Sequence, residues 1–392
     1  MTFHFDKKID RTQTHSYKWD QSAKLFGRAD ILPLWVADMD FESPPAVKEA
    51  LLRRAEQGIY GYTVKSESYT DAIVNWFNRR HGWSIAKEQL TDSPGIVTSL
   101  SLAVDLYSKP GDAVIVQSPV YYPFYDVIRM NERKIAINPL IERNGHYEMD
   151  VQQLEQLMKD GAKLMLLCNP HNPGGRVWSR DELLQLGELC LQYGVTVISD
   201  EIHCDLVLPG NDYKHVPFAS LSEQLAQLTV TCLAPTKTFN LPGLQSSFVV
   251  IANHEMKRRF DYRLKTLSLH MTNFFVPEAI AAAYNEGDEW LDALLSYVQG
   301  NVDYAISYIG EHAPILKPMR PEGTYLLWLD CRALGLQAAG LKQLMYEQAG
   351  VAFNEGSVFG TEGEGWLRVN LACPRSLLEA ALKQFCDAVN NR

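Results

Sequence analysis

The fold is decided by residues 163–199, which read KLMLLCNPHNPGGRVWSRDELLQLGELCLQYGVTVIS. Both ends of this stretch, KLMLLC and VTVIS, are apolar at successive positions, as expected for strands that helices cover on both faces. Between them, Ser179 and Glu182 form a capping box that opens an amphipathic helix, and Gly194 ends that helix. The order strand, helix, strand predicts a parallel α/β unit.

Three further apolar runs extend this pattern: Ala113–Gln117, Leu228–Leu233 and Ser247–Ala252. Together with the first two they predict a mostly parallel sheet that is covered by helices. The expected fold class is therefore α/β, with a large sheet domain and a smaller α+β domain.

The pattern changes after about residue 285. A long helix is predicted near Trp290–Ile309, strands at Thr324–Leu329 and Gly365–Asn370, and helices near Ala339–Gln348 and from about Ser376. At ~150 residues per domain, a chain of 392 residues has room for two or three domains. We expect a large domain at residues 46–285, a small domain at 286–392, and an N-terminal segment, 1–45, that packs with the small domain.

Composition excludes several classes of protein. Lys and Arg number 37 against 47 Asp and Glu, and a net charge of −10 gives no general attraction to nucleic acid or anionic membranes. No apolar run approaches the ~20 residues that span a bilayer, and Met1–Asp10 is polar, unlike a secretion signal. The seven cysteines are odd in number and form no Cys-x-x-Cys pair. These features predict a cytoplasmic protein with reduced thiols and no metal site. Dinucleotide, Walker and nucleophile-elbow motifs are absent.

Polar and aromatic residues follow four of the predicted strands. Ligands of an open parallel sheet bind at the carboxyl ends of its strands, so these residues are candidates for one site. Tyr121 and Tyr122 follow the predicted strand Ala113–Gln117. One of the two rings could lie against a bound heterocycle, although burial in the core is the simpler explanation. The loop NPHNPGG, residues 169–175, can fix an asparagine amide in one orientation because each proline restricts the residue before it.

The other two strand ends carry charge. Asp200 follows a buried strand, where an ionised carboxylate needs a partner; a cationic ring nitrogen would serve, and an N-cap or an ion pair are the alternatives. Lys237 lies between two threonines, where burial would make its amine an imine-forming nucleophile. The alternative is a lysine whose stem reaches out of the turn. His203 by itself indicates a loop histidine with satisfied hydrogen bonds.

Taken in order, Tyr121, Asn172, Asp200 and Lys237, followed by Arg368 in a late strand, resemble the functional residues of the fold type I pyridoxal-phosphate enzymes. The similarity covers roughly residues 30–375. More narrowly, five segments resemble the MalY/PatB group of carbon–sulfur β-lyases: WVADMDF at 35–41, GIYGY at 58–62, SDEIH at 199–203, KTFN at 237–240 and RVNLACPR at 368–375. The resemblance implies a pyridoxal 5′-phosphate cofactor, a cytoplasmic homodimer with shared active sites and an amino-acid substrate.

The resemblance also assigns roles by position. Lys237 matches the lysine that carries the cofactor and moves protons, and Asp200 matches the acid that pairs with the ring nitrogen. Asn172 matches the amide at the phenolic oxygen, and Tyr121 matches the aromatic residue that stacks on the ring. Arg368 matches the arginine that binds the substrate α-carboxylate, for which a bidentate fork is suited.

The phosphate is expected at a helix that begins with Gly95, Ile96 and Val97, where backbone N–H groups are free to bind an anion. Thr236 adds a hydroxyl, and Tyr62 matches a tyrosine that reaches the phosphate from the other subunit. Substrate is expected to contact Ala37 together with Asn172 and Arg368. The residues that could shape the choice of substrate are Trp35, Tyr60, Tyr122 and Phe124.

Three positions depart from the pattern of many aminotransferases of this fold. Gln245 stands where they have a phosphate-binding arginine and Ala234 where they have a serine. His203, which the resemblance places among the cofactor-binding residues, stands where they have a tyrosine. These differences favour a lyase that cleaves S-substituted L-cysteines to a thiol, pyruvate and ammonia. The alternatives are an aminotransferase of class I/II and a regulatory protein that binds a transcription activator.

Overall fold

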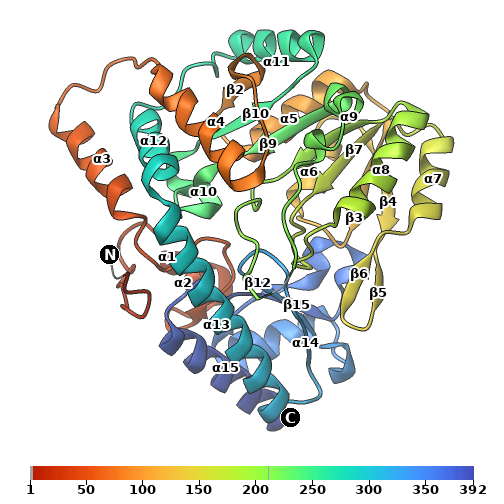
Figure 1. Cartoon of the computed structure of the whole chain (residues 1–392). Helices are drawn as coiled ribbons and strands as arrows, with labels where there is room; N and C mark the ends of the chain where they lie inside the picture. The colour runs from red at the N-terminus through yellow and green to blue at the C-terminus, as the bar shows by residue number, and fades with distance from the viewer. Residues whose placement is uncertain (1–2, 211) are drawn as a thin grey trace.

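A seven-stranded sheet forms the centre of the larger lobe in the computed structural model, which describes residues 3–210 and 212–392 (Figure 1). Its strand order is β2-β10-β9-β8-β7-β3-β4; β10 runs antiparallel to both β2 and β9, and the other neighbouring strands pair in parallel. This confirms the predicted α/β class with a mostly parallel sheet. The bounds are β2 Leu90–Ser93, β3 Ala113–Ser118, β4 Lys134–Pro139, β7 Leu164–Cys168, β8 Thr196–Asp200, β9 Thr229–Leu233 and β10 Ser247–Val250.

The continuous apolar runs of these strands follow from burial on both faces. Val114 and Val116 of β3 pack in one cluster with helices α5 (Ile96–Tyr107), α6 (Pro123–Met130) and α11 (His254–Thr266). Ile115, between them, points to the opposite cluster with α7 (Val151–Lys159) and α8 (Arg180–Tyr193). Successive side chains of a strand point to opposite faces, so every position of such a strand must be apolar.

Helix α8 has the ends that the sequence predicts. The Ser179 hydroxyl accepts a hydrogen bond from the Glu182 backbone N–H at 3.2 Å, and the Glu182 carboxylate accepts one from the Ser179 N–H at 2.8 Å. Gly194 ends the helix in the left-handed conformation, with φ of 65°. The remaining helices of this lobe are α3 Pro45–Glu56, α4 Glu67–His81, α9 Glu223–Leu228, α10 Pro235–Thr238 and α12 Val276–Glu286.

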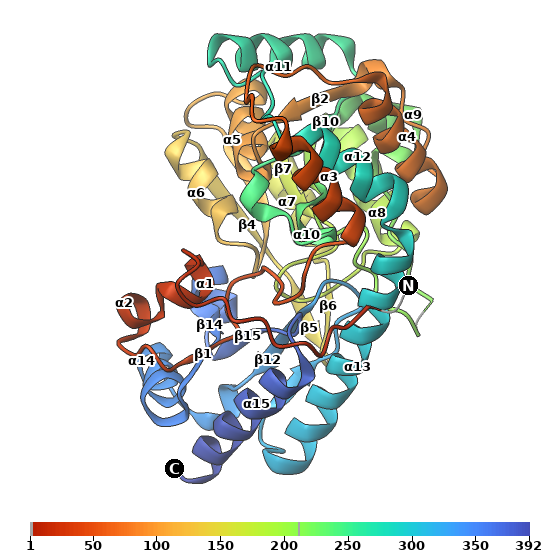
Figure 2. The same cartoon turned by 90° about the vertical axis from the view of Figure 1, so that its left-hand side faces the viewer.

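A second, antiparallel sheet forms the smaller lobe, shown below the first in Figure 2. Its order is β11-β12-β15-β14, and three helices lie with it. The two strands, the long helix, the shorter helix and the final helix predicted after residue 285 are all present. Their bounds are β11 Lys317–Met319, β12 Leu326–Asp330, β14 Asn354–Glu355, β15 Trp366–Asn370, α13 Asp288–His312, α14 Ala338–Gln343 and α15 Arg375–Asn390.

The N-terminal segment lies against the smaller lobe (Figure 2). It contains α1 (Tyr17–Asp20), α2 (Ser22–Phe26) and β1 (Leu32–Pro33), and β1 pairs in parallel with β13 (Val351–Ala352). The Asn370 amide donates hydrogen bonds to the backbone carbonyls of Val36 and Asp38, both at 2.6 Å. These bonds hold the loop 35–40 beside β15, which brings that loop to the functional cavity described below.

Sequence periodicity missed some elements. Strands β2 and β4 and the hairpin of β5 (Ile141–Arg143) with β6 (His146–Glu148) were not predicted. β2 and β4 are the edge strands of the large sheet and are less apolar than the central strands. Within residues 3–210 and 212–392, no helix has both the length and the apolar composition needed to cross a bilayer. All seven cysteines are free and buried.

Candidate active site

A cavity of about 520 Å³ opens at the carboxyl ends of the parallel strands. It is lined by residues that follow β3, β7, β8 and β9, by the start of α5, by the loop 35–37 and by residues of the smaller sheet. The cavity brings together almost all of the site residues expected from the sequence: Ala37, Gly95, Ile96, Val97, Tyr121, Asn172, Asp200, His203, Thr236, Lys237 and Arg368.

Lys237 lies in α10, the short helix that begins with Pro235 directly after β9. Its Nζ donates a hydrogen bond to the backbone carbonyl of Ala37 at 2.5 Å, and the Tyr325 hydroxyl donates to the same carbonyl at 2.9 Å. Burial lowers the pKa of Lys237 from 10.5 to about 8, and the positive charge of Arg368 acts in the same direction. The amine is therefore more easily deprotonated than an exposed lysine.

A buried network lies behind Lys237 and fixes α10. The Asp205 carboxylate accepts hydrogen bonds from the Thr238 hydroxyl at 2.8 Å and from the Trp76 indole at 2.9 Å, and it pairs with His81 at 2.8 Å. His81, Cys204 and Asp205 have the donor types of a metal site. The three hydrogen bonds already made by Asp205 explain the group as a support for the turn that carries Lys237.

Asp200 is the last residue of β8 and is only 3% exposed. Its Oδ1 accepts a hydrogen bond from the backbone N–H of Ile202 at 3.2 Å. Burial raises its pKa from 3.8 to about 7, and the neighbouring Glu201 adds to the effect. A carboxylate in this position needs a cationic partner to stay ionised.

Arg368 is the centre of a set of hydrogen bonds between the two lobes. Nη1 donates to Oδ1 of Asn172 at 2.9 Å, while Nη2 donates to Oδ1 of Asn354 at 2.7 Å and to the Trp35 carbonyl at 3.0 Å. Nε is buried and has no hydrogen-bond partner among the described residues. Burial lowers the pKa of Arg368 to about 10, so the guanidinium is still charged at neutral pH. A buried cation with a free N–H can bind an anionic group.

The turn that carries Tyr121 is held by Phe359. The Phe359 carbonyl accepts hydrogen bonds from the Val120 N–H and from the Tyr125 hydroxyl, both at 2.8 Å. The Phe359 ring lies 4.8 Å from the guanidinium carbon of Arg368. Phe359 therefore supports both the aromatic residue and the cation of the cavity, although nothing in its sequence neighbourhood distinguishes it.

Helix α5 presents its N-terminus to the cavity. Gly95 is its N-cap residue, and Gly95, Ile96, Val97 and Thr98 all line the cavity. The first N–H groups of a helix have no partner within it, so they form an anion site, to which the nearby Thr236 can add a hydroxyl. Gln245 lines the cavity as well, at the position where the sequence departs from many aminotransferases.

His203 differs from the expectation that its hydrogen bonds are satisfied. It is 3% exposed and lines the cavity, its ring lies 6.0 Å from that of Tyr325, and its Nδ1 has no partner among the described residues. Burial, together with the charges of Lys237 and Arg368, lowers its pKa to about 3, so the ring is neutral. The prediction was wrong because periodicity does not reveal which polar atoms find partners.

Two of the four residues expected to shape substrate choice lie elsewhere. Trp35 and Tyr122 line the cavity, but Phe124 is fully buried in the core, and Tyr60 is 61% exposed and packs against Phe274. Phe124 is buried because it is the second residue of α6 and lies in the cluster that this helix forms with the sheet. Tyr62 lies outside this cavity and is 96% exposed.

The sequence did not single out several residues of the cavity wall. Tyr17, Thr98, Ser246 and Asn354 line it. Thr98 could have been found as the third residue of the helix that starts at Ile96. Asn354 could not, because it reaches Arg368 only through the pairing of β14 with β15.

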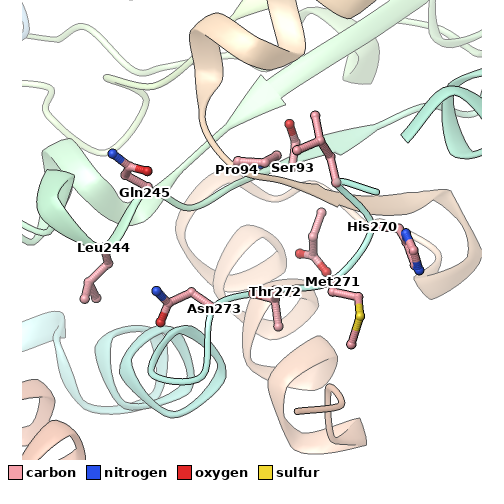
Figure 3. A pocket seen from close by; sticks show the side chains of 10 residues that line it. Ser93, Pro94, Leu244, Gln245, His270, Met271, Thr272 and Asn273 are labelled. Carbon is pink, nitrogen blue, oxygen red and sulfur yellow. The ribbon is translucent and has the colours of Figure 1, made fainter. Parts of the chain in front are cut away.

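A smaller cavity of about 180 Å³ adjoins the first and shares Pro94 and Gln245 with it. Figure 3 shows Ser93 and Pro94 at the end of β2, Leu244 and Gln245 on a second segment, and the run from His270 to Asn273 on a third. Its lining is mixed polar and apolar. Asp92, the one acidic residue among the described residues that line it, pairs with Lys65 and accepts a hydrogen bond from the Tyr69 hydroxyl.

Comparison with known proteins identifies the family of the chain. The profile of the family described as aminotransferase class I and II matches residues 29–385. Cystathionine β-lyase PatB of Bacillus subtilis is 46% identical over 98% of this chain and 100% of its own, and protein MalY of Escherichia coli is 35% identical over 99% of each chain. The crystal structure of cystalysin from Treponema denticola, which contains a pyridoxal 5′-phosphate cofactor, superposes with a TM-score of 0.96 at 36% identity over 100% of both chains. The chain therefore belongs to the aminotransferase class I and II family, in the group that includes PatB and MalY.

Proposed function

We propose that this chain is a pyridoxal-phosphate-dependent carbon–sulfur β-lyase that cleaves S-substituted L-cysteines to a thiol, pyruvate and ammonia by α,β-elimination. The observation that carries the proposal is one cavity that contains a half-buried lysine, a buried aspartate and a buried arginine, namely Lys237, Asp200 and Arg368. The names of the relatives support it, since PatB is a cystathionine β-lyase and cystalysin contains pyridoxal phosphate.

The donors and acceptors of the cavity fit pyridoxal phosphate. Burial raises the pKa of Asp200, and a protonated pyridine nitrogen beside it would keep its carboxylate ionised. The backbone N–H groups at the start of α5, at Gly95, Ile96 and Val97, would bind the phosphate. Lys237 has a lowered pKa and is the residue that would hold the aldehyde carbon.

Pyridoxal phosphate, when bound, supplies an electron sink for the pair of electrons released at Cα. Asp200 holds the proton on the pyridine nitrogen, which keeps that sink effective. Arg368 binds the α-carboxylate and fixes the orientation of the amino acid. Nζ of Lys237 takes the proton from Cα and delivers a proton to the departing sulfur.

The other residues of the cavity complete the proposed site. Asn172 would contact the phenolic oxygen of the cofactor and the substrate, and the aromatic ring of Tyr121 would contact the cofactor ring. His203 would face the cofactor as a neutral ring, and the Thr236 hydroxyl would donate a hydrogen bond to the phosphate. Ala37 would contact the substrate through its backbone. Its carbonyl oxygen already accepts a hydrogen bond from the Lys237 amine.

We propose further that the chain is a homodimer in which the partner subunit's Tyr62 reaches the phosphate. The linker between α3 and α4 supports this, since Ile59, Tyr60, Tyr62 and Val64 are all strongly exposed. A run of exposed apolar side chains is typical of a contact surface.

The proposal also includes domain limits of 1–45, 46–285 and 286–392 and a cytoplasmic location.

An aminotransferase is the second candidate, because the family profile carries that description. The two reactions differ in their co-substrate: transamination needs a 2-oxo acid and releases no ammonia. The orientation of the Cβ–S bond decides between them, since elimination requires that bond to align with the π system of the cofactor.

The test is an assay of the purified holoenzyme with L-cystathionine and S-substituted L-cysteines in the absence of any 2-oxo acid. We expect a thiol, pyruvate and ammonia in equal amounts. Turnover that requires a 2-oxo acid and yields no ammonia would establish the aminotransferase instead. Size-exclusion chromatography with light scattering tests the dimer, for which a monomeric holoenzyme is the contrary result.

A further inference from the structure

Cys168 is the last residue of β7, and its side chain lines the main cavity. The pairing of β7 with β8 places it opposite Asp200 in the sheet, and it is 6% exposed. Burial and the negative charge of Asp200 raise the pKa of the thiol, so the sulfur is protonated at neutral pH. The proposed reaction gives this thiol no task, although it lies among the groups that would hold the cofactor.

The Cys168 sulfur bonds to the backbone of the loop that follows β7. Sγ accepts a hydrogen bond from the Asn172 N–H at 3.4 Å and donates one to the Pro170 carbonyl at 3.5 Å. A thiol is a weak donor and a weak acceptor, and here it is both at once. Residues 169–173 are all buried, so their backbone groups need partners within the protein. Cys168 supplies such a partner on each side of His171.

Asn172 depends on this loop for its orientation. Its Oδ1 accepts a hydrogen bond from Nη1 of Arg368 at 2.9 Å, so its Nδ2 group is the donor that can turn to a ligand in the cavity. Pro173 restricts the Asn172 backbone from the other side, because a proline limits the residue before it. The bond to Sγ ties the Asn172 N–H to the end of β7. All of these atoms belong to one subunit, and Asn172 is only 4% exposed.

We propose that Cys168 is a positioning residue: its sulfur holds the backbone of Asn172 and so sets the direction in which the Asn172 amide meets the cofactor and Arg368. The inference rests on the proposed function, in which that amide contacts the phenolic oxygen. The sulfur forms no covalent bond in the reaction. Its part is to keep a buried loop at a fixed distance from the end of β7. A donor that is fixed in advance binds more tightly than one that must be ordered on binding, because its conformational entropy is already lost.

The first test measures amide hydrogen exchange at residue 172 in the full-length protein, with and without pyridoxal phosphate. Cys168→Ala removes the acceptor of the Asn172 N–H, so we expect exchange at this amide to become about fivefold faster or more in both states. Cys168→Ser keeps a donor and an acceptor and should recover part of the protection. Equal exchange rates in the wild type and in Cys168→Ala overturn the proposal, whatever the activity of the protein.

The second test follows the cofactor and the reaction in the same variants. A weaker bond from Asn172 leaves the phenolic oxygen more basic, so the visible absorbance of the Cys168→Ala holoenzyme should change at a pH about half a unit higher. Its kcat/KM for pyruvate release should fall about fivefold, and Cys168→Ser should lie between it and the wild type. An unchanged midpoint of the absorbance change in Cys168→Ala overturns the link to the cofactor.

Cys232→Ala is the matched control. Cys232 pairs with Asp200 from the other neighbouring strand, β9, is fully buried and belongs to the same apolar cluster as Cys168, but it does not line the cavity. This variant loses the same sulfur beside Asp200 and should leave both the exchange at residue 172 and the absorbance midpoint unchanged. Equal changes in the two alanine variants would show a general effect of sulfur loss and overturn the role of Cys168. A wild-type protein that binds no pyridoxal phosphate overturns the proposed function itself.

Discussion

Nη1 of Arg368 donates a hydrogen bond to Oδ1 of Asn172 across 2.9 Å, and this bond joins the two lobes at the cavity. Arg368 belongs to β15 of the smaller sheet, whereas Asn172 follows β7 of the larger sheet. Asn354, from the neighbouring strand β14, accepts from the other terminal nitrogen of the guanidinium. The orientation of the Arg368 guanidinium is thus set from both lobes at once.

Replacement of Arg368 by alanine should raise KM for amino acids with a free α-carboxylate by about a hundredfold, since a charge-assisted pair of hydrogen bonds contributes about 3 kcal/mol. Arg368→Lys should recover only a small part of the loss, because an ammonium cannot form the planar fork. Steady-state kinetics of the loaded enzyme measure both. An unchanged KM in Arg368→Ala would place the carboxylate elsewhere.

Asp200→Asn should impair chemistry far more than cofactor binding. An amide cannot hold a proton on the pyridine nitrogen, so kcat should fall by about a hundredfold or more, while bound pyridoxal phosphate stays within about twofold. The cofactor content is read from the visible absorbance and the rate from pyruvate release. A normal kcat in this variant contradicts the proposed role of Asp200.

The same carboxylate predicts a pH dependence of stability in the cofactor-free protein. Burial raises the folded-state pKa of Asp200 to about 7, above its unfolded value of 3.8. The folded state then binds more protons than the unfolded state between these values, so the Asp200 contribution to the free energy of unfolding falls as pH rises from about 4 to 7, by up to about 4 kcal/mol. Denaturant unfolding of the wild type and of Asp200→Asn across this range isolates the effect. Parallel curves for the two proteins would show that Asp200 has an ordinary pKa.

Phe359→Leu should raise KM about fivefold with little change in kcat. The backbone carbonyl that holds the Tyr121 turn is retained, but the ring that lies 4.8 Å from the Arg368 guanidinium is lost. Phe353→Leu is a matched control, since Phe353 is equally buried and packs against Phe385 instead. If both variants change KM alike, the effect is one of general stability.

Lys18→Met should destabilise the protein by about 3 kcal/mol, because it leaves the buried carboxylate of Asp40 without its closest cation. The double variant Lys18→Met with Asp40→Asn should recover most of this loss, since no buried charge is left unpaired. Urea unfolding of the holoenzyme measures both. A loss below about 1 kcal/mol in the single variant would show that Arg11, the second cation on Asp40, compensates fully.

Sequence patterns predicted the elements whose formation depends on nearby residues, such as helix caps and continuous apolar strands. The capping box at Ser179 and the strand predicted at Val195–Ser199, observed at Thr196–Asp200, were correct to within a residue or two. The reversed direction of β10 could not be predicted, because an apolar run carries no sign of the direction in which its neighbours run. The edge strands β2 and β4 were missed because they lack a continuous apolar run.

The candidate site divides in the same way. Asp200 and Lys237 were indicated by position, since charged residues directly after buried strands require an explanation. Arg368 was indicated only by the family resemblance, because the sequence of the strand around it contains no motif that indicates ligand binding. Asn354 lines the cavity and Phe359 contacts Arg368 through packing between segments distant in sequence, and such contacts leave no local signal.

The central claim is that the amine of Lys237 carries pyridoxal phosphate. The most direct measurement is borohydride reduction of the holoenzyme followed by proteolysis and mass spectrometry of the peptides, with Lys237→Ala as the control. The account predicts one phosphopyridoxyl label, on Lys237, and none in the variant. A label on another lysine would contradict this claim, and so would a purified protein that binds no pyridoxal phosphate.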